Sequence, residues 1–227
     1  MSYIGTTEIG KMFLGGVEIE KAYLGNDLEF QEGTAPTPTI GIPYIRGGDN
    51  GSYIDTGITA DNTTRVIVWA RNFTPNSGVL FGSRIGLSNS AFALGTYGDT
   101  NIGRLRFDYG NSTVYADDQF SNLSHYHKYE LDGNVLKVDD VTLISATSAT
   151  FSNNLNIHLL SLNNNGTNAS NSLPIDLCAC KIYKGGVLVR DFTAVNSPSV
   201  GLYDSVSGTM FTNAGSGSFT YGTNVET

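Results

Sequence analysis

Glu130 and Asp132 stand two residues apart and are the nearest approach in the sequence to a catalytic carboxylate pair. Retaining glycoside hydrolases hold an acid and a nucleophile about 5 Å apart, and alternate residues of a strand share one face. Asp132, however, belongs to the turn with Gly133 and Asn134, and no third carboxylate follows before Asp139. No Gly-x-Ser-x-Gly elbow lies between a strand and a helix either. We therefore expect no enzyme activity and keep glycan cleavage as an alternative.

Histidine and acidic side chains offer two weak metal patterns. His125 and His127 share a strand face at i and i+2 and would need a third ligand from a neighbouring strand. Surface histidines on either side of Tyr126 are the simpler interpretation. We expect no cofactor, with a structural calcium ion held by loop oxygens as the alternative, although no EF-hand pattern is present and turns explain the same residues. The calcium candidates are Asp99, Asn101, Asp139 and Asp140.

Glycan binding needs an aromatic ring to lie against a sugar face, with Asn, Asp or Arg side chains around it to take the hydroxyl groups. The sequence offers this combination in the segment 97–104 and around 109–115. Tyr115 is a further candidate ring, whereas the single tryptophan, Trp69, has apolar neighbours on both strand faces and is expected in the core. The Asn-rich segment 161–172 is expected to form an exposed rim loop. The expected ligand-binding residues are Tyr97, Asp99, Asn101, Arg104, Tyr109 and Asn111.

The two cysteines, Cys178 and Cys180, lie in an apolar strand pattern. Alternate residues of a strand point to one face, so both side chains are expected on the same face with poor geometry for bridging each other. We predict two buried free thiols in a chain that folds in a reducing cytoplasm.

Charge and hydropathy exclude several partner classes. The formal net charge is -8 and the pI about 4.7, which disfavours a phosphate backbone and predicts no nucleic-acid binding. The N-terminus lacks the basic and apolar regions of an export signal. No apolar run approaches the roughly 20 residues that cross a bilayer, so we expect no membrane insertion.

The elements that must position these residues are predicted to be strands. Gly is high at 27 residues, charged residues make up 15%, and no sustained helical periodicity occurs. Residues 63–73 form a strand that is apolar on both faces, and strands then recur about every ten residues between Gly, Asn or Asp turns. A two-residue turn at 185–186 predicts that Lys184 pairs with Val187 and Lys181 with Arg190, which places two cations side by side. Such a pair fits a solvated face with a carboxylate nearby, or an anion-binding patch.

The first thirty residues repeat with a period of ten, and each unit reads as one short strand plus a glycine turn. Strands this few cannot bury a core, so the segment is expected to attach to sister chains or to another protein, with its rings as attachment residues. A Pro-rich linker follows. The predicted organisation is an N-terminal β-repeat over 1–30, a linker over 31–43 and a larger domain over 44–227. The attachment residues are Phe13, Tyr23 and Phe30.

Five phrases carry a family resemblance, the most specific being the last: SYIDTGITADNTTRVIVWARNF, VLFGSR, HKYELDGNVLKVDD, CKIYKGGVLVRDFTAV and VGLYDSVSGTMFTNAGSGSFTYG. Their order resembles the concanavalin A-like, laminin G-like jelly-roll domains of bacteriophage and prophage tail and virion proteins. The resemblance covers about 44 to 224 and implies an all-β, lectin-like jelly-roll sandwich of two antiparallel sheets. The closing GLYD phrase reads as a structural clasp, because its apolar residues alternate as core residues do.

This resemblance implies a phage virion accessory protein, a fibre or decoration of the tail or head, assembled in the cytoplasm of a host bacterium. Its expected role is adhesion to host-surface or environmental glycans, as a homotrimer bound to other virion proteins through residues 1–30. A fold does not fix a function, so a glycan-degrading depolymerase and a purely structural decoration remain the alternatives.

Overall fold

A computed structural model describes residues 2–4, 7–9, 12–14, 17–19, 42–47, 51–73, 78–86, 90–96, 104–117, 125–169 and 174–224. All regular elements within these ranges are β-strands, which confirms the all-β prediction. None of the described residues forms a helix long and apolar enough to cross a lipid bilayer. Contacts divide the chain into two units, Met1–Gly33 and Thr34–Thr227.

The described residues of the N-terminal unit, which lie between 2 and 19, form two pairs of antiparallel strands rather than single strands. Its strands are β1 (Ser2–Ile4), β2 (Thr7–Ile9), β3 (Met12–Leu14) and β4 (Val17–Ile19). Ser2 pairs with Ile9, and Met12 pairs with Ile19, so the second hairpin repeats the register of the first after ten residues. Within residues 2–19, one strand per ten residues was therefore the wrong prediction, because two paired strands recur in each ten-residue period. Phe13 lies in β3, whereas Tyr23, Phe30 and most of the predicted linker fall outside the described residues.

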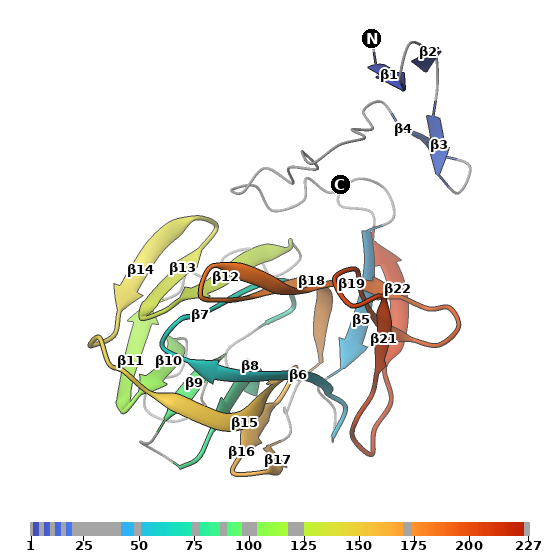
Figure 1. Cartoon of the computed structure of the whole chain (residues 1–227). Helices are drawn as coiled ribbons and strands as arrows, with labels where there is room; N and C mark the ends of the chain where they lie inside the picture. Colours follow the sequence, from blue (N-terminus) through green and yellow to red (C-terminus); the bar gives the residue numbers. More distant parts are fainter. Residues whose placement is uncertain are drawn as a thin grey trace. The chain divides into compact units, whose positions relative to one another are not determined.

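The larger unit is a sandwich of two antiparallel sheets, as predicted, and Figure 1 shows the two layers edge-on. The smaller sheet runs in the order β11-β10-β9-β8-β15-β6, with the β16–β17 hairpin joined to β8 by a short parallel pairing. Its strands are β6 (Ile54–Asp61), β8 (Gly78–Arg84), β9 (Ala91–Thr96), β10 (Arg104–Gly110), β11 (Ser112–Asp117), β15 (Ser152–Leu159), β16 (Leu162–Asn164) and β17 (Thr167–Ala169).

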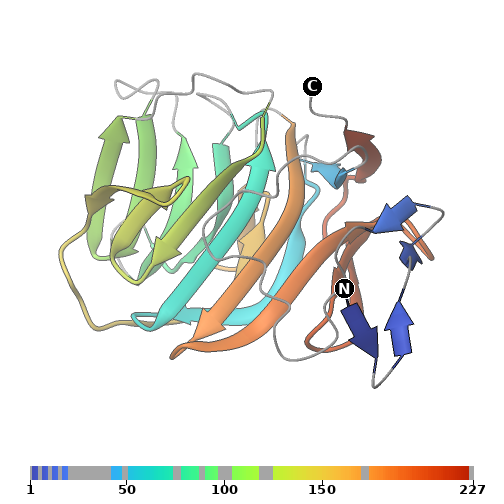
Figure 2. The same ribbon diagram turned by 90° about the horizontal axis from the view of Figure 1, so that it is seen from above.

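The larger sheet runs in the order β14-β13-β12-β7-β18-β19-β20-β21, and β5 and β22 extend it beside β18. Figure 2 shows β7 and β18 as long neighbouring strands of this layer. Ile42 and Pro43, assigned to the linker from the sequence, belong to β5. The strands are β5 (Ile42–Gly47), β7 (Thr64–Arg71), β12 (His127–Asp132), β13 (Val135–Val138), β14 (Val141–Ser145), β18 (Ile175–Lys184), β19 (Val187–Val195), β20 (Gly201–Asp204), β21 (Thr209–Thr212) and β22 (Thr220–Asn224).

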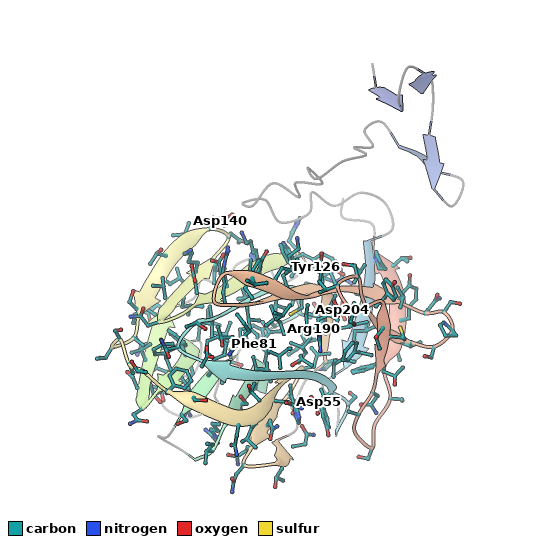
Figure 3. The ribbon with its side chains drawn as sticks, in the orientation of Figure 1. Asp55, Phe81, Tyr126, Asp140, Arg190 and Asp204 are labelled. Carbon is teal, nitrogen blue, oxygen red and sulfur yellow. The ribbon has the colours of Figure 1, made fainter. Side chains whose placement is uncertain are left out.

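The main core lies between the sheets and draws alternate residues from each strand. Val66 and Val68 of β7 face this core, as does Phe81 of β8, which is labelled between the layers in Figure 3. Ile67 and Trp69, the intervening residues of β7, belong to a second cluster on the outward face of the larger sheet. The prediction that 63–73 is apolar on both faces is therefore confirmed. Trp69 is buried as predicted, although outside the main core.

A β-bulge in β18 separates the two cysteines. Leu177 pairs with Ala70 of β7 and Ala179 with Trp69, so Cys178 is the extra residue. The bulge shifts the alternation by one position, and Cys178 faces the outward cluster while Cys180 faces the main core. The expectation that both thiols share a face is wrong. Both are free and buried, as predicted.

A second irregularity changes the register of the β18–β19 hairpin. Lys184 pairs with Val187 as predicted, but the register shifts between Tyr183 and Ile182. Lys181 consequently pairs with Asp191, and their charged atoms lie 4.0 Å apart. The predicted pairing of Lys181 with Arg190 is wrong, because the shift replaces a repulsive cation pair with an attractive one.

The described part of the Asn-rich segment, up to residue 169, is a hairpin rather than a loop. Leu162–Asn164 and Thr167–Ala169 pair across Asn165 and Gly166, both of which have positive φ. Asn followed by Gly is the residue pair that this turn favours. The hairpin also pairs with the end of β8 and so extends the smaller sheet beside Arg84.

Candidate functional site

The ligand-binding residues predicted from sequence are not brought together as one site. Tyr97, Asp99 and Asn101 fall outside the described residues. Arg104 begins β10, whereas Asn111 follows its last residue. A strand of seven residues is about 20 Å long, so Arg104 and Asn111 lie at opposite ends of it.

Tyr109 was expected to offer its ring to a sugar, and the structure places it in the main core instead. Its side chain meets the ring of Phe151 edge-on, with ring centroids 5.0 Å apart. The hydroxyl donates towards the carbonyl oxygens of Asn62 and Ala149, and burial raises the pKa of Tyr109. The expectation fails because alternate residues of a strand share one face. Tyr109 therefore lies on the same face of β10 as Leu105 and Phe107, which also point into the core.

The alternate residues of β10 point away from the core and form a polar outward face on the smaller sheet. Arg104, Arg106 and Asp108 alternate with the core residues, and each is paired across to a residue of β11. The pairs are Arg104 with Asp117, Arg106 with Tyr115, and Asp108 with Thr113.

The floor beside this polar row is made of small residues. Ala93 of β9 is in register with Asp108, and Gly95 with Arg106. A Cβ atom at Gly82 of β8 would overlap Ala93, and one at Gly95 would lie 2.9 Å from the carbonyl oxygen of Gly78. Because these residues have little or no side chain, backbone atoms form the middle of this face. Long side chains from β8 and β10 can therefore reach across it.

Arg84 and Asp108 meet over this floor. Arg84 Nε donates to Asn164 Oδ1 at 3.0 Å, and Arg84 Nη1 lies 4.0 Å from Asp108 Oδ2. Asp108 Oδ1 accepts hydrogen bonds from Arg106 Nε at 2.9 Å and from Thr113 Oγ1 at 2.6 Å. We call these five residues the Arg84–Asp108 cluster. Both central residues are buried, with 8% of Arg84 and 2% of Asp108 exposed, on a face that points away from the core.

Arg104 and Tyr115 continue the cluster towards the β11 edge. The Arg104 guanidinium carbon lies 5.9 Å from the Tyr115 ring centroid, and Arg104 Nε lies 2.7 Å from Asp117 Oδ1. Sequence reasoning named Arg104 and Tyr115 but missed Arg84, Arg106 and Asp108. The alternation of charged and apolar residues in RLRFDY over 104–109 is the signal that indicates an outward polar row.

A stacked pair lies at the other end of the same face. His158 of β15 is in register with Gly82, and its ring stacks on Tyr53 with centroids 4.2 Å apart and planes at 19°. Burial lowers the pKa of His158, and the nearby Asp55 only partly opposes this shift. His158 Nδ1 has no hydrogen-bond partner within the described part of the chain.

The outward face of the larger sheet carries more aromatic residues, but its charged groups are paired with one another. Asp176 accepts from Arg46 Nε at 2.5 Å and from Arg71 Nε at 2.8 Å. Both guanidinium groups also lie over the Tyr44 ring. Among the described residues Trp69 Nε1 lacks a hydrogen-bond partner, but this indole N–H is a neutral donor. On the smaller sheet, by contrast, a charged donor, Arg84 Nη1, lacks a hydrogen-bond partner among the described residues, and we therefore place the candidate site there.

Glu130, the catalytic candidate, is held by cations on the larger sheet. Its Oε1 atom accepts from Arg65 Nε at 3.1 Å and from Lys137 Nζ at 3.0 Å, and the residue is 1% exposed. Asp132 ends β12 before the turn at Gly133, which has positive φ. Turn formation accounts for Asp132 as the sequence indicated, and the absence of enzyme activity stays a prediction.

The metal candidates that the structure describes contact protein groups. Asp139 Oδ2 lies 2.7 Å from His127 Nδ1, and Asp140 Oδ1 accepts from Lys128 Nζ at 2.7 Å. Burial raises the pKa of Asp139, but hydrogen bonds from His127 and Lys128 outweigh it and lower the pKa overall. Within the described ranges no group of three His, Cys, Asp or Glu side chains is arranged to hold a metal ion. Calcium binding through Asp99 and Asn101 stays untested.

No protein-family model and no curated protein matches the chain. Its function is therefore inferred from the geometry of the Arg84–Asp108 cluster and from the resemblance in the sequence.

Proposed function

We propose that this chain is a non-catalytic, glycan-binding accessory protein of a bacteriophage virion, with its ligand on the outward face of the smaller sheet. The observation that supports glycan binding is the Arg84–Asp108 cluster. It joins fixed donors and acceptors over a floor of small residues on a face that points away from the core. Sugar hydroxyl groups both donate and accept, so such a row can bind neighbouring hydroxyls of one ring.

Tyr115 supplies the apolar part of this chemistry. It follows Thr113 on the outward side of β11 and is half-buried beside Arg104. An aromatic ring next to charged hydrogen-bonding groups matches the alternating apolar and polar faces of a pyranose. The β16–β17 hairpin adds Asn164 at the opposite side of the cluster, where it already fixes Arg84.

The place on a virion is argued from the sequence resemblance and from the N-terminal unit. An isolated two-stranded hairpin is marginally stable in water, so two repeated hairpins gain stability by packing against partner surfaces. In this proposal residues 1–30, including Phe13, Tyr23 and Phe30, attach the sandwich to other virion proteins as a homotrimer. Assembly then takes place in the cytoplasm of the host bacterium.

Glycan binding is tested by applying the purified full-length chain to an array of bacterial surface glycans. Tyr115→Ala is expected to weaken binding to any captured glycan by about tenfold. Tyr203→Ala is the matched control, because Tyr203 is an exposed tyrosine on the larger sheet. An array that stays blank, or an equal loss in both variants, contradicts the proposal. If the chain still coats particles when the array is blank, a purely structural decoration is supported.

Attachment is tested with virions or subassemblies that lack the protein. Deletion of residues 1–30 is expected to abolish binding to them, and equal binding of the truncated chain contradicts the attachment role. Release of fragments from host capsular polysaccharide, lost in Glu130→Gln, would instead support a depolymerase.

A further inference from the structure

The Arg84 guanidinium has unused hydrogen-bonding capacity in a buried position. Its side chain is 9% exposed, and Nε is the nitrogen that donates to Asn164. Nη1 is buried and has no hydrogen-bond partner among the residues that the structure describes. The nearest carboxylate oxygen, Asp108 Oδ2, lies 4.0 Å away, which is beyond hydrogen-bond distance. Buried polar groups almost always have partners, so an unused charged donor indicates a missing acceptor.

The surrounding charges favour an anionic acceptor. Among the described residues of β8, β10 and β11, this face presents three arginines, Arg84, Arg104 and Arg106, against two aspartates. Arg104 lies against Asp117, and Arg106 donates to Asp108. Arg84 is the guanidinium left without a carboxylate at hydrogen-bond distance. This local surplus of positive charge occurs in a chain whose formal net charge is -8.

The shape of the donor group selects the kind of anion. A guanidinium is planar and presents parallel N–H groups, which match the two oxygens of a carboxylate better than a point charge does. Ala93, on the floor beside Arg84, is buried with Val79 and Leu162, so we assign the contact with the ligand to the guanidinium group and not to the floor.

We propose that Arg84 binds the carboxylate of an acidic sugar, so that the preferred glycan contains uronic acid residues. This inference rests on the proposed glycan-binding function and specifies its ligand class. Asp108 fixes Arg106 and Thr113 through Oδ1, and its nearby charge weakens the attraction of Arg84 for any anion, the uronate included.

The test compares two oligosaccharides that differ only in the carboxylate: an oligomer of glucuronic acid and its carboxyl-reduced counterpart, an oligomer of glucose. Full-length chain is expected to bind the acidic oligomer at least about tenfold more tightly. Arg84→Gln is expected to remove this preference, and Arg84→Lys to reduce it. Lys181→Gln changes the net charge equally on the larger sheet and is expected to leave the preference unchanged.

A second variant keeps the inference testable if changes at Arg84 disturb folding. Asp108→Asn removes the carboxylate charge nearest to Arg84 Nη1, so the preference for the acidic oligomer is expected to rise. Equal binding of both oligomers, an unchanged preference in Arg84→Gln, or tighter binding of a sulfated glucose oligomer overturns the uronate inference and leaves glycan binding standing. Failure to bind any glycan overturns both.

Discussion

Lys184 Nζ lies 2.6 Å from Asp61 Oδ2, and this ion pair joins the β18–β19 hairpin of the larger sheet to the end of β6 in the smaller sheet. Asp61 Oδ1 also accepts from Thr63 N at 2.8 Å, and Lys184 Nζ donates to Thr64 Oγ1 at 3.1 Å. The chain passes from one sheet to the other between Asp61 and Thr64. The pair therefore fixes a corner of the sandwich.

Asp61 is expected to contribute to acid sensitivity. Burial raises its pKa, but hydrogen bonds from Lys184 and Thr63 outweigh burial and lower the pKa to about 2, from 3.8. Between pH 4 and 2 the unfolded chain therefore binds more protons at this residue, and the free energy of unfolding falls as the pH falls. Asp61→Asn is expected to make the fall shallower, measured by urea unfolding at several pH values. Asp117→Asn, an exposed control, should keep the wild-type slope, and an equally steep slope in Asp61→Asn contradicts the prediction.

Asp204 is expected to be important for stability. Its buried carboxylate accepts from Asp191 N at 2.7 Å and from Ser207 Oγ at 2.6 Å, and it lies close to Arg190, as Figure 3 shows. Asp204→Ala removes the charged acceptor of these hydrogen bonds and is expected to lower the free energy of unfolding by about 2 kcal/mol. Asp204→Asn keeps one acceptor and should cost less. Chemical unfolding measures both.

The control for Asp204 is Asp132→Ala, because about half of the Asp132 side chain is exposed at the end of β12. A change within about 0.5 kcal/mol is expected there. Equal losses in Asp204→Ala and Asp132→Ala would contradict the clasp role of the GLYD phrase.

Alternation along single strands was sufficient to predict the sandwich, the two-sided β7 and the buried cysteines. It failed at Cys178 and at Lys181, where extra residues change the register. A bulge depends on the neighbouring strands as much as on its own residues, and neither segment has a glycine or proline at the irregular position to indicate one. Predictions of side-chain direction therefore fail after the bulge, while the strands themselves are predicted correctly.

The candidate site was only partly predictable for a related reason. Arg104 and Tyr115 belong to the sequence segments 97–104 and 109–115, which combine rings with polar side chains, whereas Arg84 comes from β8 and meets Asp108 across the intervening strand β9. Contacts between such strands follow from sheet order, which one sequence does not reveal. Tyr109, by contrast, is predictable from the alternation along β10, because it lies two and four residues after the core residues Phe107 and Leu105.

The two cysteines are expected to react differently with a thiol reagent in the native chain. Cys180 is fully buried in the main core, and burial together with the charges of Asp191 and Asp204 raises its pKa well above the usual value. Cys178 faces outward and should react first, as measured by mass spectrometry of labelled peptides. Unfolded chain, in which both should react equally, is the control. A native Cys178–Cys180 disulfide would contradict their placement on opposite faces.

His158 is expected to make the sandwich less stable just below neutral pH. Its pKa is lowered in the folded chain by burial, so the unfolded chain binds the proton more readily below the ordinary value of 6.5. The free energy of unfolding should therefore fall as the pH drops from 6.5 to the lower pKa that His158 has in the folded chain. His158→Phe keeps a ring stacked on Tyr53 and is expected to remove this dependence in urea unfolding between pH 8 and 5. His125→Phe, at a half-buried position before β12, is the histidine control, and an unchanged pH profile in His158→Phe would show that another group titrates.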